Sequence, residues 1–398
     1  MSNETSLNPV ERFASIYSHI HAPCVLVICV FGCVANVSNV AVLTRKVMRV
    51  QPTNIILCGL SVAQLLLLAN FLCYTCYTSF YDSPCAYKAK TYGWLLALLM
   101  NVNANLILHT TALVMTVMLG VFRYIIIHFV NQRQLISTQV ATRAIFIAFA
   151  CVPVLCVPFY MNSTISSVHH QDMMARCGAM ADGNHTAYRL AYTTNTALTS
   201  FNFWAFGVIC KLVPCACLVI VSALLIRELK LASDRQARLG CAQQSNRCYI
   251  PFSTYRHSQT TKLLLVILCL FVSVEMPQVT VVSFAGILNV FVGLQRGGVI
   301  FNDFNFTGRV YIPLGDFFEM LTVLYSAINF VLYCGMSSQF RAEFVQMCAS
   351  ARNRIGHYCY GCRSGSKSSE GKHSQALLPP TAAANSNDVQ LNADTSQV

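Results

Sequence analysis

Seven long apolar runs, separated by polar loops, limit what this chain can fold into more than any other feature of its sequence. A helix needs about 20 apolar residues to cross the roughly 30 Å hydrocarbon core of a bilayer. Runs close to this length lie at about 22–44, 54–78, 92–125, 142–161, 200–226, 262–287 and 310–334. The sequence therefore predicts an all-α membrane protein, a bundle of seven transmembrane helices with little room for a separate soluble domain.

Composition and charge agree with a membrane protein. Hydrophobic residues make up 55% of the chain and charged residues only 11%, which is unusual for a soluble domain of this size. The net charge of +12 is concentrated in alternate loops rather than along one face, so no nucleic-acid partner is expected. By the positive-inside rule the basic loops are cytoplasmic and the N-terminus lies outside the cell. These loops hold, among others, Arg45, Lys46, Arg49, Arg133, Arg227, Arg256 and Arg341.

Glycosylation sequons support the same topology. Four of them begin at Asn3, Asn162, Asn184 and Asn305, all in segments that the charges place outside the cell, whereas a fifth at Asn36 lies within the first span. Residues 1–21 are polar and no cleavable signal peptide is apparent, so they are expected to form an extracellular tail before an uncleaved first span. We therefore predict a multi-pass protein of the plasma membrane.

Most of the 20 cysteines lie within the predicted spans, where a thiol packs as a small apolar group. Cys85 and Cys177 fall clearly in extracellular loops. Because that compartment is oxidising, we expect a disulfide between them, with Cys73 and Cys76 as competing partners.

Three further cysteines, Cys348, Cys359 and Cys362, follow the last span on the cytoplasmic side. A single Cys-x-x-Cys pair beside His357 is a weak metal motif, so these are expected to be palmitoylation sites or inert thiols, and no metal is expected.

Ionisable residues inside a membrane are costly and usually face the bundle interior. At about 1.5 Å per helical residue, His109, Lys211 and Glu275 come to similar depth on three different helices. We expect Lys211 to pair with Glu275 and His109 to join the same network, because an unpaired Glu275 would be driven toward its neutral form. The alternative is that Lys211 extends toward the membrane surface and Glu275 is neutral.

The outer end of the seventh span carries Asp316 and Glu319, which are three residues apart and share one face of the helix. Two acidic side chains at the outer end of the bundle favour a cationic ligand. On the third span, Asn101, Asn105 and His109 recur every four residues and form a polar stripe. The stripe predicts either ligand contacts or hydrogen bonds between helices.

Prolines at Pro158, Pro214 and Pro277 are expected to kink the fourth, fifth and sixth spans. After the membrane domain of residues 22–334, apolar residues at helical spacing predict an amphipathic helix over 335–350 on the inner leaflet. Residues 351–398 are polar and are expected to form a disordered cytoplasmic tail.

Short motifs lie at the ends and middles of several spans. They are Asn36, Arg45-Lys46, Pro52-Thr53-Asn54, Phe122-Arg123-Tyr124, Lys211-Leu-Val-Pro214, Glu275-Met276-Pro277-Gln278, Asn329-Phe330 and Tyr333-Cys334. With these motifs the chain resembles rhodopsin-like G-protein-coupled receptors, and most closely the invertebrate myosuppressin and FMRFamide-type peptide receptors. The resemblance covers essentially all seven spans.

The chain departs from the wider family at several positions. Glu275 stands where many such receptors have a Trp switch, and Phe330 stands where they have Pro. Gln64 replaces a common Asp, which puts the sodium-binding pocket of related receptors in doubt. Phe122 replaces the acidic neighbour of Arg123 and so removes one restraint on this arginine.

The resemblance implies an extracellular peptide ligand ending in Arg-Phe-amide, whose guanidinium would bind Asp316 or Glu319. The candidate ligand-binding residues are Asp316, Glu319, Asn101, Asn105, His109, Lys211, Glu275 and Gln278. It also implies that the sixth helix swings outward about Pro277 and that a heterotrimeric G protein, favoured as the inhibitory type, binds the cytoplasmic side. The candidate residues for this step are Arg123, Tyr124, Pro277, Asn329 and Tyr333.

The polar tail and the spans bear on further partners and on rival functions. Ser364, Ser366, Ser368 and Ser369 are candidate phosphorylation sites for arrestin binding, and the terminal Thr-Ser-Gln-Val can add as a strand to a PDZ domain. No nucleophile motif or metal-binding histidine cluster is present in the spans, so neither a cofactor nor enzymatic activity is expected. The rival hypothesis is a chemosensory receptor for a small molecule on the same scaffold.

Overall fold

A computed structural model describes residues 9–81, 91–129, 137–168, 187–193, 195–242, 262, 265–277 and 312–365. In these ranges six helical segments are long and apolar enough to cross a membrane: His19–Leu43, Pro52–Ser79, Tyr92–His128, Thr138–Tyr160, Phe206–Leu231 and Gly315–Gly335. A shorter apolar helix, Leu265–Pro277, lies where the sixth span is expected. The rest of that predicted span lies outside the described residues.

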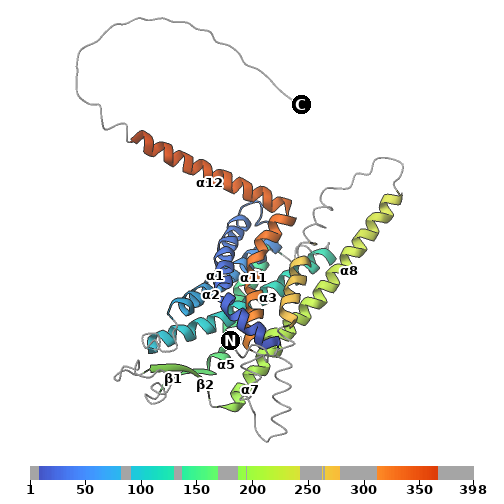
Figure 1. The fold of residues 1–398 in the computed structure, drawn as a ribbon. Coiled ribbons are helices and arrows are strands. Elements are labelled where there is room, and N and C mark those ends of the chain that lie inside the picture. Colours follow the sequence, from blue (N-terminus) through green and yellow to red (C-terminus); the bar gives the residue numbers. More distant parts are fainter. Residues whose placement is uncertain are drawn as a thin grey trace, which may run out of the picture. The chain divides into compact units, whose positions relative to one another are not determined.

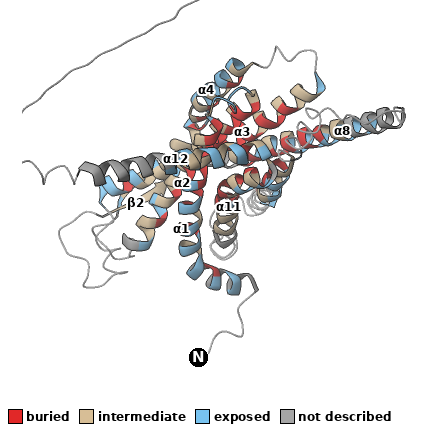
Figure 2. Cartoon of the chain, turned by 90° about the horizontal axis from the view of Figure 1, so that it is seen from above, coloured by how far each residue is buried: buried red, intermediate tan, exposed pale blue. Residues whose placement is uncertain are grey.

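The helices of the bundle pack mainly through α2 and α3 (Figure 1). Helix α2 (Pro52–Tyr81) contacts α1 (Pro9–Leu43), α3 (Tyr92–His128) and α4 (Thr138–Leu155). Helix α11 (Ile312–Met336) packs on α1, and α3 packs on α8 (Val213–Ala242). Apart from Leu95, the buried residues of α3 lie between Thr110 and Arg123, while α1 exposes much of its surface (Figure 2). Exposed apolar side chains on the outside of the bundle suit contact with lipid.

Close packing in the core depends on small residues. A Cβ atom at Gly32 of α1 would lie 2.7 Å from Leu68 Cδ1 and 2.8 Å from the Cβ atom of Ala327, so α1, α2 and α11 meet closely there. The neighbouring Asn36 is fully buried and donates from Nδ2 to the carbonyl of Ser326 at 3.0 Å. This polar contact ties α1 to α11 inside the bundle.

Helix α1 begins earlier than expected, at Pro9, within the segment predicted to be an extracellular tail. Aromatic contacts explain the extension. The ring of Phe13 stacks on Tyr17 with centroids 5.4 Å apart, and both rings meet Phe317 of α11 edge-on at 5.7 and 5.8 Å. These contacts stabilise helical turns that carry no long apolar run.

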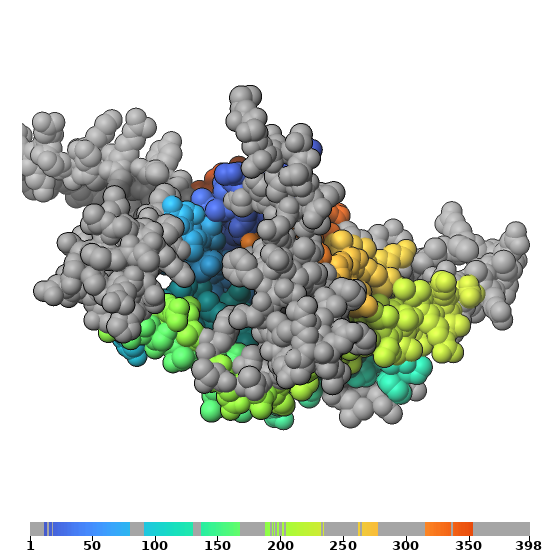
Figure 3. Space-filling model, turned by 60° about the horizontal axis from the view of Figure 1, so that its bottom comes forward, coloured from blue at the N-terminus to red at the C-terminus, as the bar shows by residue number. Residues whose placement is uncertain are grey.

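The described part of the chain is mostly helical, as expected, and the loop after α4 adds a β-hairpin. Strands β1 (Ser163–Val168) and β2 (Ala187–Tyr192) pair antiparallel, with Ser163 opposite Tyr192 and Val168 opposite Ala187. Both strands contact α3, and the ring of Tyr188 lies 5.5 Å from that of Tyr92. Figure 3 views this end of the bundle, with the hairpin segment in green. Pairing of the two strands satisfies backbone hydrogen bonds of the loop. Their side chains are of mixed polarity, so no apolar run in the sequence indicates these strands.

Two of the expected proline sites lie at irregular points of the helices. Helix α4 ends at Leu155, and Pro158 lies in the first turn of the short α5 (Val157–Tyr160). The π-helical segment η5 (Phe206–Leu212) continues α7 (Thr196–Ala205) into α8, and Pro214 is the second residue of α8. A proline has no amide hydrogen, and its ring clashes with the carbonyl of the preceding helical turn. A widened, π-helical turn before the proline relieves this clash.

The last described helix, α12 (Ser338–Gly365), includes most of the predicted segment 335–350 and continues into the predicted tail. It contains no proline to end it earlier. The chain divides into two compact units, residues 1–345 and 346–398, so only the first turns of α12 belong to the bundle. There Phe340 is buried, and the rings of Phe340 and Phe344 lie 6.0 and 5.2 Å from Phe330.

Candidate functional site

A buried cluster of one cation, one anion and one imidazole links three segments of the bundle. The Nζ atom of Lys211, in η5, lies 2.6 Å from Oε2 of Glu275 and 2.5 Å from Nε2 of His109 on α3. The Lys211 side chain is 2% exposed and that of Glu275 is fully buried. This confirms the expected pairing, and Lys211 does not extend to the membrane surface.

The ammonium group of Lys211 has enough hydrogens to donate to both neighbours. If it donates to Nε2, the imidazole of His109 carries its hydrogen on Nδ1. Nε2 of His109 is also 3.5 Å from Oε1 of Glu275, so a protonated imidazole would pair with the same carboxylate. The cluster therefore joins α3, η5 and the sixth-helix segment through charge.

An acidic cavity of about 200 Å³ lies between α1, α2 and α11. Asp316 and Glu319 both line it, as expected from their spacing on one face of the helix. No Lys or Arg is present among the lining residues, which are His21, Ala22, Val25, Phe71, Tyr74, Thr75, Thr78, Asp316, Glu319 and Val323. A cationic group would be electrostatically favoured here.

The extended start of α1 forms part of this site, which the sequence analysis missed. The hydroxyl of Tyr17 lies 2.7 Å from Nδ1 of His21 and donates to the backbone carbonyl of Asp316 at 3.2 Å. Burial, followed by the nearby Asp316 carboxylate, raises the pKa of Tyr17 to about 12, so its hydroxyl keeps its proton. The spacing of Phe13, Tyr17 and His21, one every four residues, was the signal that could have revealed this helical face.

The polar stripe of α3 divides between two roles. Asn101 donates from Nδ2 to Oδ1 of Asn70 at 2.8 Å, and the Nδ2 of Asn70 donates to the carbonyl of Asn101 at 3.0 Å. This is the helix-to-helix bonding that the sequence left as an alternative. Asn105 instead donates from Nδ2 to Oε1 of Glu319 at 3.3 Å, which connects the stripe to the acidic cavity. One turn further along α3 lies His109, in the buried charge cluster.

At the other end of α3, Arg123 is 2% exposed, and its Nε and Nη2 atoms make no hydrogen bond within the described part of the chain. Its neighbour Tyr124 stacks on His128, with centroids 5.2 Å apart. The Nδ1 atom of His128 lies 2.9 Å from Glu228 Oε1 on α8. A polar contact between α3 and α8 is thus made by His128.

The middle of the bundle carries a neutral polar pair. Asn329 of α11 donates from Nδ2 to Oε1 of Gln64 on α2 at 2.8 Å. Tyr333, one turn further along α11, is buried. Two neutral amides place no negative charge at this point of the described bundle.

Several predicted residues remain untested. Cys85, Cys177, Asn3, Asn184, Asn305 and Gln278 lie outside the described residues. Asn162 follows α5, and its carbonyl accepts from the amide of Thr193 at 2.9 Å, which closes the base of the hairpin. Pro277 is exposed at the end of the described sixth-helix segment. Cys348 is exposed on α12, and the same helix includes positions 359 and 362.

These observations define a multi-pass membrane protein with a charged core and an acidic cavity at one end. The family model described as serpentine type 7TM GPCR chemoreceptor Srw matches residues 23–350, and the chain belongs to this family of G-protein-coupled receptors. It is therefore a receptor rather than an enzyme. Members of this class respond to a peptide or a small molecule and couple to a G protein.

The chain is similar to several characterised receptors. It is 27% identical over 382 residues to the G-protein coupled receptor dmsr-1 of Caenorhabditis elegans, with 86% of this chain and 71% of that protein covered. It is 25% identical over 360 residues to the human thyrotropin-releasing hormone receptor, covering 87% and 82%. It is 24% identical over 360 residues to the Drosophila melanogaster sex peptide receptor, covering 87% and 75%.

Proposed function

We propose that this receptor detects an extracellular neuropeptide of the Arg-Phe-amide type and that the peptide's guanidinium group binds Asp316 and Glu319. The observation that carries this proposal is the acidic cavity, which holds two carboxylates one turn apart and no Lys or Arg among its described lining residues. A planar guanidinium forms charge-assisted and bidentate bonds with such carboxylates. Similarity to receptors named for a sex peptide and for thyrotropin-releasing hormone supports a peptide ligand.

The size of the cavity limits what enters it. At about 200 Å³ it accommodates a side chain rather than a whole peptide, because ligand pockets for drug-sized molecules are about 300–1,000 Å³. The rest of the peptide would then lie further out, over the hairpin and the start of α1. In the proposed topology this end faces the outside of the cell, and the protein is located in the plasma membrane.

The signal would pass inward through the polar contacts of α3. A guanidinium that binds Glu319 competes with its hydrogen bond from Asn105, which lies one turn from His109. His109 in turn contacts the Lys211–Glu275 pair, which holds the sixth-helix segment to η5. Ligand binding would favour a bundle in which this helix moves outward about Pro277.

The outward state would bind a heterotrimeric G protein, with the inhibitory type favoured by the resemblance to peptide receptors. Arg123, Tyr124, Asn329 and Tyr333 would form the responding surface. Arg123 supports this role because its guanidinium is buried with donor atoms that the described residues leave unpaired. A buried donor without a hydrogen-bond partner costs free energy, so a carbonyl or carboxylate of the G protein would stabilise this guanidinium.

The test measures binding of amidated peptides to membranes from cells that express the full chain. Active peptides are first found by a screen with a promiscuous G protein. The variant Asp316→Asn/Glu319→Gln should weaken binding of an active Arg-Phe-amide peptide by at least about tenfold, because it removes two charge-assisted contacts. The control Asp234→Asn removes an exposed carboxylate at the far end of α8 and should leave binding unchanged.

Two further results would contradict the proposal. The first is unchanged affinity in the double variant. The second is equal affinity for a peptide in which citrulline replaces arginine, since citrulline keeps the shape but lacks the charge.

A second candidate function is detection of a small cationic molecule, which the chemoreceptor family and the small size of the cavity favour. A panel of biogenic amines, run beside the amidated peptides, separates the two. Responses to an amine that depend on Asp316 and Glu319, without any response to peptides, would identify the small-molecule sensor.

A further inference from the structure

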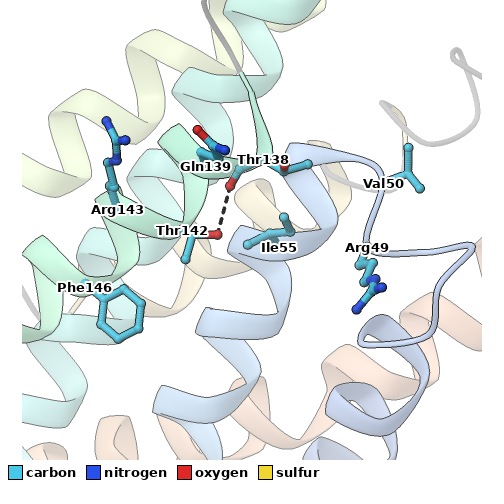
Figure 4. A pocket seen from close by; sticks show the side chains of 8 residues that line it. All are labelled: Arg49, Val50, Ile55, Thr138, Gln139, Thr142, Arg143 and Phe146. Atoms are coloured by element: carbon cyan, nitrogen blue, oxygen red, sulfur yellow. Dashed lines mark hydrogen bonds between the residues drawn. The ribbon is translucent and has the colours of Figure 1, made fainter.

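The acidic cavity adjoins a second pocket along α2. This pocket has a volume of about 130 Å³ and lies between the end of α2 and the start of α3. A larger groove of about 830 Å³, with Arg49 and Arg143 on its two sides, lies at the opposite end of α2 (Figure 4). Of these two, the smaller pocket alone shares a lining residue with the acidic cavity, and that residue is Tyr74.

The smaller pocket, here called the aromatic pocket, is lined mainly by rings and aliphatic side chains. Its walls include Cys73, Tyr74, Tyr77, Trp94, Ala97 and Leu98. The rings of Tyr77 and Trp94 meet edge-to-face, with centroids 4.1 Å apart. No charged side chain is among its described lining residues. Uncharged walls with aromatic rings favour an apolar, planar group.

Asn101 also lines the aromatic pocket, but its amide is already used between the helices. Its Nδ2 atom donates to Oδ1 and to the backbone carbonyl of Asn70, at 2.8 and 3.1 Å. A polar group of a ligand would compete with these bonds, whereas an apolar group needs none of them. The pocket therefore favours an apolar group on chemical grounds as well.

The volume of the aromatic pocket limits which ring fits it. An engineered apolar cavity of about 150 Å³ in another protein binds benzene. The aromatic pocket, at about 130 Å³, therefore suits one six-membered ring. An indole or a naphthalene has a second fused ring and exceeds this space.

The aromatic pocket and the acidic cavity lie at the same level of the bundle and meet at Tyr74. The α2 residues that line the acidic cavity fall within 71–78, and those of the aromatic pocket fall within 73–77, so the two overlap along the helix axis. Side chains of consecutive residues in an extended chain point to opposite sides. Two neighbouring residues whose backbone crosses Tyr74 would therefore place one side chain in each cavity.

We propose that the aromatic pocket binds a single aromatic ring of the ligand whose cation occupies the acidic cavity. This inference rests on the proposed function and specifies its ligand further. In an Arg-Phe-amide peptide, the ring is the phenylalanine that follows the arginine, and the backbone between them crosses Tyr74. Phenylalanine fits the pocket, alanine leaves it empty and tryptophan exceeds it.

The first experiment tests the aromatic pocket without a peptide. Cys73 lines the pocket and Cys151 of α4 does not, although both are exposed. The purified full-length receptor is treated in a neutral detergent with methanethiosulfonates that carry a benzyl, naphthylmethyl or n-butyl group. The cysteine thiolate forms a mixed disulfide with each reagent and releases methanesulfinate. Peptide mass mapping should show a rate ratio of benzyl to n-butyl at least about fivefold higher at Cys73 than at Cys151.

Two variants change the size of the pocket in opposite directions. Ala97→Leu fills it and should abolish the benzyl preference at Cys73. Ala97 is exposed, so the larger side chain does not disturb the packing of the helices. Leu98→Ala enlarges the pocket and should let the naphthylmethyl reagent react as fast as the benzyl reagent. Equal ratios at the two cysteines of the wild type, or a benzyl preference that survives Ala97→Leu, would overturn the proposal.

The second experiment locates the ring of a bound ligand. An active Arg-Phe-amide peptide and its analogue with alanine in place of phenylalanine are bound to the wild type and to Ala97→Leu. The analogue should bind the wild type about thirtyfold more weakly than the parent peptide, but Ala97→Leu less than about threefold more weakly, because the filled pocket no longer receives the ring. Val102→Phe adds bulk outside the pocket, at a position of α3 that is 49% exposed, and should keep the thirtyfold difference.

The outcomes separate this inference from the proposed function. An equal difference between the peptides on the wild type and on Ala97→Leu would overturn the aromatic pocket as the site of the ring. The proposed function would still stand if binding of the parent peptide depends on Asp316 and Glu319. Conversely, a benzyl preference at Cys73 in a receptor that binds no amidated peptide would contradict the peptide ligand and support the pocket.

Discussion

The ammonium nitrogen of Lys211 lies 2.6 Å from a carboxylate oxygen of Glu275, and the two side chains are 2% and 0% exposed. The pair joins η5 to the sixth-helix segment in the middle of the bundle. In so dry an environment each charge depends on the other, because either one alone would be buried without compensation. The first two predictions follow from this dependence.

Replacement of Lys211 by Met should destabilise the receptor by about 3–5 kcal/mol, since it leaves Glu275 buried without its partner. Thermal unfolding of the purified receptor in detergent measures the effect. The exchange Lys211→Glu/Glu275→Lys restores an opposite-charge pair and should recover most of the loss seen in either single reversal. If the exchanged receptor is no more stable than the weaker single variant, the two residues do not act as a pair.

Glu275→Gln should raise signalling in the absence of ligand, because the uncharged amide holds the sixth helix to η5 less strongly and the outward state becomes more populated. Basal nucleotide exchange on the G protein, normalised to receptor at the cell surface, provides the measurement. Ser273→Ala on the exposed face of the same segment is the matched control. Equal basal activity in Glu275→Gln and the wild type would count against a restraining role for the pair.

Asn101→Ala should lower stability by about 0.6–1.7 kcal/mol without a change in ligand affinity, because the Asn101 amide bonds to Asn70 between helices. Asn105→Ala, one turn further along α3, should alter ligand response because Asn105 bonds to Glu319. Thermal unfolding and ligand binding, measured side by side, separate these roles. A large loss of affinity in Asn101→Ala would place that residue in the ligand site instead.

Tyr17→Ala should weaken ligand binding severalfold and lower the unfolding temperature, since Tyr17 is 5% exposed and joins the start of α1 to α11. The neighbouring Ile16 is 60% exposed, so Ile16→Ala is a matched control expected to have little effect. Saturation binding and thermal unfolding on both variants provide the comparison. If the two variants behave alike, the extension of α1 does not form part of the site.

Much of the site followed from local spacing along single helices. Depth along a helix follows from a rise of about 1.5 Å per residue, and this alone places His109, Lys211 and Glu275 at a similar level. In the same way, three-residue spacing placed Asp316 and Glu319 on one face. The partner of Asn101 could not be derived in this way, because the rotation of α2 against α3 determines which side chain of α2 it meets.

The sequence by itself determined the membrane-spanning class, the approximate extent of the spans and the depth of the buried charges. These depend on apolar length and helical rise, which are properties of each segment alone. Only the tertiary structure decided that His21 lines the acidic cavity, that Tyr17 bonds to the backbone of Asp316, that the loop after α4 forms a hairpin and that Arg49 and Arg143 flank one groove. Each of these depends on contacts between segments distant in the chain, and the packing of side chains between helices sets those contacts.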